Sequence, residues 1–117
     1  MPSMVEEQCL MRLFIGESDS YGHHPLSEAL LDLFRRHSIS GVTILRGIAG
    51  YGARNILHTD RLLELSQDLP IILEVVESRD TIDRLMPELD RIMNSSGMVT
   101  LEMVEVIRYR DAGADVP

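Results

Sequence analysis

The chain has 117 residues, of which 44% are hydrophobic and 26% charged, a composition typical of one globular domain with one core. Its formal net charge of −8 argues against a protein that coats nucleic acid or an anionic membrane, because both need a basic surface. Cys9 is the only cysteine, so no intrachain disulfide can form. The acidic start does not resemble a signal peptide, and we expect a cytoplasmic protein.

The first half of the chain predicts a strand, a helix and a second strand. Residues 9–16 form a short apolar run that ends at a glycine, and a polar loop follows. Pro25 suits the first turn of the helix, where its missing N–H costs nothing. Residues 41–47 predict the second strand. The helix carries an apolar stripe at helical spacing, made of Leu26, Ala29, Leu30, Leu33 and Phe34.

The second half predicts a strand, a helix and a last strand. The strand covers residues 69–78, and Ser78 is placed to cap the helix that follows. Pro87 lies inside this helix and removes one backbone hydrogen bond, so we expect a kink there. A turn at 94–97 leads into a strand over 98–110. The apolar stripe of this helix is Ile82, Leu85, Met86, Leu89, Ile92 and Met93.

The order βαββαβ predicts an α+β, ferredoxin-like fold, with a four-stranded antiparallel sheet and two helices on one face. The predicted strands are apolar on both faces: Leu10 and Phe14 alternate with Met11 and Leu13 in the first strand. Two helices cover only one face of such a sheet. We therefore expect other copies of the chain to cover the second face.

The glycines at 47, 50 and 52 and a pair of arginines are the candidates for ligand recognition. The glycine spacing, G-x-x-G-x-G, is the reverse of the dinucleotide fingerprint and favours a turn over a phosphate loop. Residues 50–68 form an unusually long connection between two strands, which is often functional. Arg108 and Arg110 are two residues apart on a strand, so they point to the same side. They form either surface ion pairs or a clamp for an anion.

Several long segments of the chain resemble a widespread bacterial and archaeal family related to the PII signalling proteins. They are FIGES, GVTILRGIAGYG, HTDRLLELSQDLPIILEVV and VTLEMVEVIRY, within a span of about residues 10–109. The motif GYG, residues 50–52, is similar to the glycine-aromatic-glycine at the base of the PII T-loop. The motif VIRYR, residues 106–110, is similar to the VIRIR that ends the last PII strand.

The resemblance implies a homotrimer that binds an adenine nucleotide, as an effector rather than a cofactor, in clefts between subunits. Residues 50–68 then correspond to the T-loop and residues 94–97 to the glycine-rich B-loop. Gly97 stands where PII has a lysine for the phosphates, so a smaller anion is an alternative to a triphosphate. The RGAEY segment that PII proteins use for uridylylation is absent. The implied ligand contacts are Gly50, Tyr51, Gly52, Arg54, Ser95, Ser96, Gly97, Arg108 and Arg110.

The predicted function is that of a non-enzymatic regulator, because no nucleophile or acid-base pair can be located. Residues 50–68 would report the bound effector to a partner protein. The prediction treats 1–117 as a single domain with a core over about 8–110 and a flexible tail over 111–117. Two alternatives stay open. One is a CutA-like metal-binding trimer that uses His23, His24 or His58. The other is an accessory subunit of a membrane transporter, since relatives of the family occur beside ion-channel genes.

Overall fold

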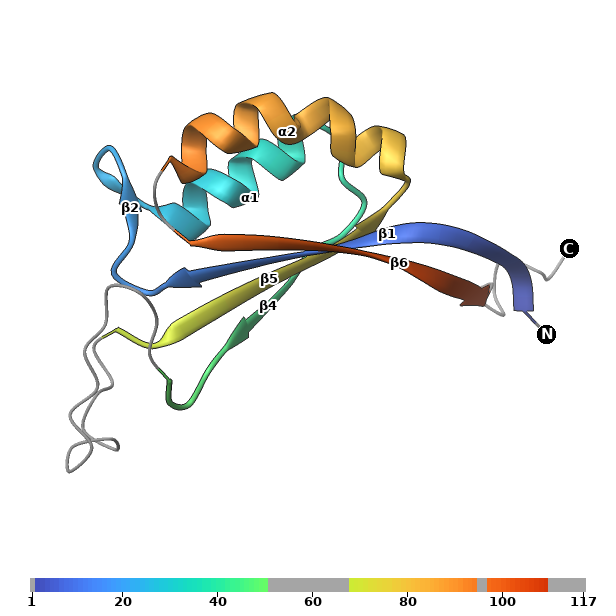
Figure 1. Cartoon of the computed structure of the whole chain (residues 1–117), viewed down its shortest axis with the longest axis horizontal. Coiled ribbons are helices and arrows are strands. Elements are labelled where there is room, and N and C mark those ends of the chain that lie inside the picture. The colour runs from blue at the N-terminus through green and yellow to red at the C-terminus, as the bar shows by residue number, and fades with distance from the viewer. Residues whose placement is uncertain (1, 51–67, 95–96, 110–117) are drawn as a thin grey trace, which may run out of the picture.

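The computed structural model describes residues 2–50, 68–94 and 97–109. Two helices lie side by side over one face of a four-stranded antiparallel sheet, and none of these described residues covers the other face, which is called the open face below (Figure 1). The strands run in the order β4-β5-β1-β6. This is the predicted α+β, ferredoxin-like fold. Its main elements are β1 (Pro2–Gly16), α1 (Leu26–Arg36), β4 (Thr43–Arg46), β5 (Pro70–Glu77), α2 (Arg79–Met93) and β6 (Met98–Tyr109).

The first strand is longer than predicted. β1 begins at Pro2 rather than at Cys9, because its N-terminal half pairs with the second half of β6, as in the pair Val5 and Ile107. Residues 2–8 are mostly polar, and their pairing depends on a partner about a hundred residues away, which local periodicity does not reveal. The predicted loop after β1 also contains two short strands, β2 (Ser20–Tyr21) and β3 (His24–Pro25), paired as a small hairpin.

The core lies between the sheet and the helices, and both predicted apolar stripes line it. Leu30 and Leu33 of α1 and Leu85 of α2 are completely buried, as are Met11 and Leu13 of β1. Burying a side chain of this size is worth about 1.5–3 kcal/mol, so this layer is the main source of the fold's stability. No helix in the described parts of the chain is long and apolar enough to cross a membrane.

The ends of α2 follow the predicted local chemistry. The Ser78 hydroxyl accepts a hydrogen bond from the backbone N–H of Thr81, which satisfies one of the unpaired donors of the first turn. Pro87 lies inside the helix, which continues to Met93. The following residue, Asn94, adopts a φ of 51°, which ends the helix and turns the chain towards β6.

The open face of the sheet carries an apolar row across all four strands. Cross-strand pairing places Leu45, Ile72, Phe14 and Met98 beside one another on this face. Leu45 and Met98 are 45% and 56% exposed, and the two inner members are half-buried. The described residues therefore leave a continuous apolar surface uncovered, as predicted from strands that are apolar on both faces.

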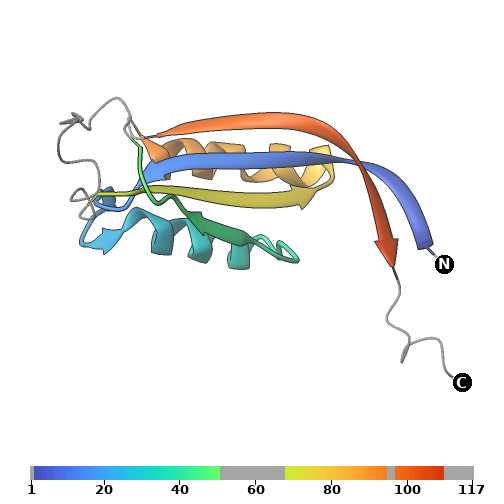
Figure 2. The same cartoon turned by 90° about the horizontal axis from the view of Figure 1, so that it is seen from below.

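The outer halves of β1 and β6 extend beyond the helices as a two-stranded ribbon (Figures 1 and 2). One end of the sheet therefore has four paired strands, whereas the other has only β1 and β6. Strand β6 begins where β1 ends, and it finishes beside the start of β1 (Figure 2).

Candidate functional site

Gly50 lies where the chain leaves the sheet for the long segment predicted as a T-loop. A Cβ atom at this position would lie 2.9 Å from Cγ of Pro70, and one at Gly47 would lie 3.0 Å from the same atom. Gly47 N also donates a hydrogen bond of 2.8 Å to the carbonyl of Pro70. Both glycines are thus explained by close packing on the first residue of β5, and this contact holds the two ends of the segment together.

Charged groups fix the same end of the sheet. Nη2 of Arg46 lies 3.0 Å and 2.7 Å from the two carboxylate oxygens of Glu17. The hydrogen bond from Arg46 lowers the pKa of Glu17 below its usual value. The carboxylate of Asp68 accepts a hydrogen bond of 2.9 Å from the backbone N–H of Ser18. Residues on both sides of the 51–67 segment are therefore bound to the loop after β1.

Gly97 immediately precedes β6 at this same end and has a left-handed backbone, with a φ of 81°. A Cβ atom there would lie 2.6 Å from the backbone oxygen of Phe14 and 2.9 Å from Cε of Met93. Backbone conformation and space both require glycine at this position. The side chain that PII proteins carry at this point of the B-loop has no room here unless the turn changes.

Arg108 lies on the open face near the far end of β6. Its Nε donates a hydrogen bond of 3.0 Å to Oε1 of Glu6 in β1. The strand register pairs Glu6 with Val106 and Met4 with Arg108, so the two charged residues are diagonal neighbours on one face. The surface ion pair that the sequence left open as one reading of Arg108 is present.

The predicted site residues are not gathered in one place within a single chain. Gly50 and Gly97 lie at the end of the sheet where β1 finishes, whereas Arg108 lies beside the start of β1 (Figure 1). At the usual rise per residue, β6 separates Gly97 from Arg108 by roughly 35 Å. A small anion cannot contact both in one subunit. The other predicted contacts lie outside the described residues: Tyr51, Gly52, Arg54, Ser95, Ser96 and Arg110.

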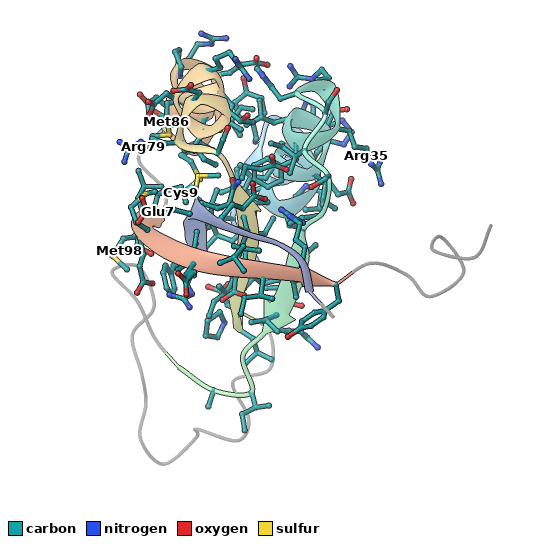
Figure 3. The ribbon with its side chains drawn as sticks, turned by 90° about the vertical axis from the view of Figure 1, so that its right-hand side faces the viewer. Glu7, Cys9, Arg35, Arg79, Met86 and Met98 are labelled. Atoms are coloured by element: carbon teal, nitrogen blue, oxygen red, sulfur yellow. The ribbon has the colours of Figure 1, made fainter. Side chains whose placement is uncertain are left out.

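The histidines of the alternative metal site are exposed in the β2–β3 hairpin or lie outside the described residues. His23 and His24 belong to the hairpin, and His58 falls in the segment that is not described. Cys9 is completely buried on the helix side of the sheet, beneath α2 (Figure 3). Over residues 2–50, 68–94 and 97–109, no group of three His, Cys, Asp or Glu side chains is arranged to hold a metal ion.

An ion network in the middle of the open face was not predicted. Nε of Arg12 donates to Glu74 at 2.8 Å, and its Nη1 donates to Glu102 at 3.4 Å. The hydrogen bond with Glu74, the largest influence, raises the pKa of Arg12. The contacts join β1 to both of its neighbours. The sequence showed Arg12 as the polar residue of an apolar strand, but its partners follow only from the strand register.

The order of strands and the two helices on one face give a ferredoxin-like fold that the chain shares with solved PII-like proteins. Over 92% of this chain, the fold matches the whole of CPII, a nitrogen regulatory PII-like protein from Thiomonas intermedia K12 solved with ADP, AMP and bicarbonate, with a TM-score of 0.65 and 16% identity. The chain belongs to the DUF190 family (Uncharacterized ACR), whose model matches residues 8–106.

Relatives in the same family come from a bacterium and an archaeon. A UPF0166 protein of Aquifex aeolicus is 33% identical over 88% of this chain and 96% of its own length. A UPF0166 protein of Methanocaldococcus jannaschii is 28% identical over 79% of this chain and 84% of its own length. The predicted relation to a bacterial and archaeal PII-like family is thereby confirmed.

Proposed function

We propose that the protein is a non-enzymatic, PII-like regulator that binds a small anionic effector in clefts between subunits of a homotrimer. Adenine nucleotides and bicarbonate are the first candidates, because CPII, which shares the fold, was solved with ADP, AMP and bicarbonate. The segment over residues 50–68 would transmit the occupancy of the cleft to a partner protein, with a membrane transporter as one candidate.

The placement of Gly97 and Arg108 at opposite ends of β6 is the observation that carries the proposal. If both contact one small effector, then each site must combine the loop end of one subunit with the Arg108 end of another. Gly50 lies at the same end as Gly97, so it joins the same half of the cleft.

The open face of the sheet supports such an assembly. The row that contains Ile72 and Phe14 is apolar across the sheet, and the described residues leave it uncovered. Burial of apolar surface contributes about 25 cal/mol per Å², so contact between the open faces of several copies would stabilise an oligomer. The Arg12 network would then lie within the interface, where paired charges help to fix the register between copies.

The base of the 51–67 segment supports a role in transmission. The contacts of Gly50 with Pro70, of Arg46 with Glu17 and of Ser18 with Asp68 fix both ends of the segment to the sheet. An effector bound beside Gly50 would therefore contact a part of the chain whose position is already fixed. Its binding would change the conformation of the 51–67 segment rather than the position of the ends of that segment.

Titration calorimetry with ADP, AMP, ATP and bicarbonate tests the proposal. We expect at least one of them to bind, and Arg108→Ala to weaken it at least about tenfold, since hydrogen bonds to charged groups are worth about 1.5–3 kcal/mol. Arg35→Ala is the matched control, because Arg35 is an exposed arginine on α1, on the helix side of the sheet (Figure 3). The absence of binding by all four compounds would contradict the proposal, as would equal losses in the two variants.

A further inference from the structure

We infer that Glu6 determines the charge class of the effector, by holding Arg108 in a pair that has no net charge. The inference rests on the proposed function, since it concerns the same anion site. It starts from the hydrogen bond of 3.0 Å between Nε of Arg108 and Oε1 of Glu6. Nothing in the local sequence links these residues, which are 102 positions apart.

The register keeps Glu6 beside Arg108. Both residues lie on paired strands, on the same face of the sheet, as diagonal neighbours. Arg108 is 49% exposed and Glu6 is 32% exposed. The carboxylate is thus the more covered partner, and the strand register keeps Glu6 near the guanidinium.

An incoming anion meets Glu6 in one of two ways. If the anion takes Nε of Arg108, it has to replace the Glu6 carboxylate. If it takes the outer nitrogens of the guanidinium, Glu6 stays in place and repels it. Coulomb repulsion rises in proportion to the charge of the ligand. In both cases the Glu6 carboxylate remains near the bound anion and lowers its affinity, and the loss is larger for ATP than for ADP, and larger for ADP than for AMP or bicarbonate.

Position 97 also limits the positive charge of the site. Gly97 has no room for a side chain, because a Cβ atom there would lie 2.6 Å from a backbone oxygen. Position 97 therefore supplies no cation, and Glu6 neutralises the cation at position 108. The pair of features favours an effector with few negative charges.

Glu6→Gln tests the inference, because glutamine keeps the shape and an acceptor oxygen but removes the charge. Exposed ion pairs are worth about 0.2–1 kcal/mol, so we expect affinity to rise by up to about fivefold, with a larger gain for ATP than for AMP. Glu7→Gln is the matched control. It makes the same change in net charge at the next residue, which the register puts on the opposite face of the sheet, with Cys9 (Figure 3). We expect Glu7→Gln to leave the ratio of ATP to AMP affinity unchanged.

Calorimetry with ATP, ADP and AMP on the wild type, Glu6→Gln, Glu7→Gln and Arg108→Ala separates the outcomes. A raised ratio of ATP to AMP affinity in Glu6→Gln alone supports the inference, as does binding that appears only in Glu6→Gln. An unchanged ratio in Glu6→Gln, together with weaker binding in Arg108→Ala, overturns the inference and leaves the proposed function standing. If neither the wild type nor any variant binds a nucleotide, the result contradicts both the proposed nucleotide site and the role of Glu6 in it.

Discussion

Gly97 lies directly against the backbone of Phe14, so closely that a Cβ atom would come within 2.6 Å of the Phe14 oxygen. We therefore expect Gly97→Ala to destabilise the fold strongly. The left-handed backbone alone costs an alanine about 1–2 kcal/mol, and the clash adds to this. Thermal unfolding followed by circular dichroism should show a midpoint lowered by at least about 4–8 °C.

Two other glycines separate these causes. Gly22 has a φ of 64° but open space around its virtual Cβ, so Gly22→Ala should show only the backbone cost. Gly41 has open space and its φ is not positive, so Gly41→Ala should be close to neutral or slightly stabilising. If Gly97→Ala lowered the unfolding midpoint no more than Gly22→Ala, the close approach of Gly97 to Phe14 would add no cost to that of the left-handed backbone.

The carboxylate of Glu88 joins the two helices, and it predicts a pH-dependent stability. Hydrogen bonds from Arg36, the larger influence, and from His37 lower the pKa of Glu88 below its usual value. A carboxyl group with a lowered folded-state pKa contributes stability above its unfolded pKa and loses it as the pH falls through the folded value. Wild type should therefore be more stable than Glu88→Gln at pH 7, and the difference should shrink as the pH falls through the lowered folded-state pKa of Glu88.

Urea unfolding at pH 7 and at pH 3 measures this difference. Asp83→Asn is the control, because Asp83 pairs with Arg79 within one turn of α2 and does not link the helices. Pairs of this local kind contribute little to stability. An equal difference between wild type and Glu88→Gln at both pH values would show that the ion pairs with Arg36 and His37 are not its source.

The two sides of β5 should respond differently to truncation. Leu73 faces the helices and is completely buried, whereas its neighbour Ile72 lies on the open face and is only half-buried. Leu73→Ala should lower the free energy of unfolding by about 2–5 kcal/mol, since it leaves a cavity in the core. Ile72→Ala, measured by urea unfolding at a concentration too low for self-association, should cost much less. Similar losses for both would mean that the open face is covered within a single chain.

Much of this fold follows from local patterns in the sequence. The stripe from Leu26 to Phe34 identified α1, and the hydroxyl of Ser78 identified the start of α2, because both depend on residues within one or two turns. The start of β1 was wrong, since the pairing of Val5 with Ile107 depends on register across the whole chain. Register between distant strands carries no local signal, and polar residues such as Glu6 and Glu7 do not resemble a buried strand.

Less of the candidate site could be predicted from the sequence, because it also depends on the register between distant strands. The motif that contains Arg108 was visible, but its partner Glu6 was not, because only the pairing of β1 with β6 brings them together. The glycine motif was interpreted as a turn, and the packing of Gly50 on Pro70 agrees with that interpretation. The predicted contacts at Gly50, Gly97 and Arg108 remain a proposal, since a second copy is needed to join them.

The apolar row on the open face predicts how the assembly can be broken. Ile72→Glu places a charge between Leu45 and Phe14, its two cross-strand neighbours. If copies associate through this face, the carboxylate has to be desolvated at the interface. The free energy of that desolvation exceeds the free energy gained from the apolar contact. We expect a homotrimer for the wild type and a monomer for the variant, measured by size-exclusion chromatography with light scattering.

Ile44→Glu is the matched control for this change in charge and size. Ile44 is 43% exposed and its register partner is Leu73, so it lies on the helix side of the sheet, and a glutamate there should leave an assembly through the open face intact. The retained helix signal in circular dichroism would show that Ile72→Glu still folds, as expected for a residue outside the core. A wild-type protein that is monomeric at every concentration would rule out self-association through the open face. A homotrimer that survives Ile72→Glu would place the subunit interface elsewhere, with the ribbon that carries Val5 and Ile107 as the next surface to test.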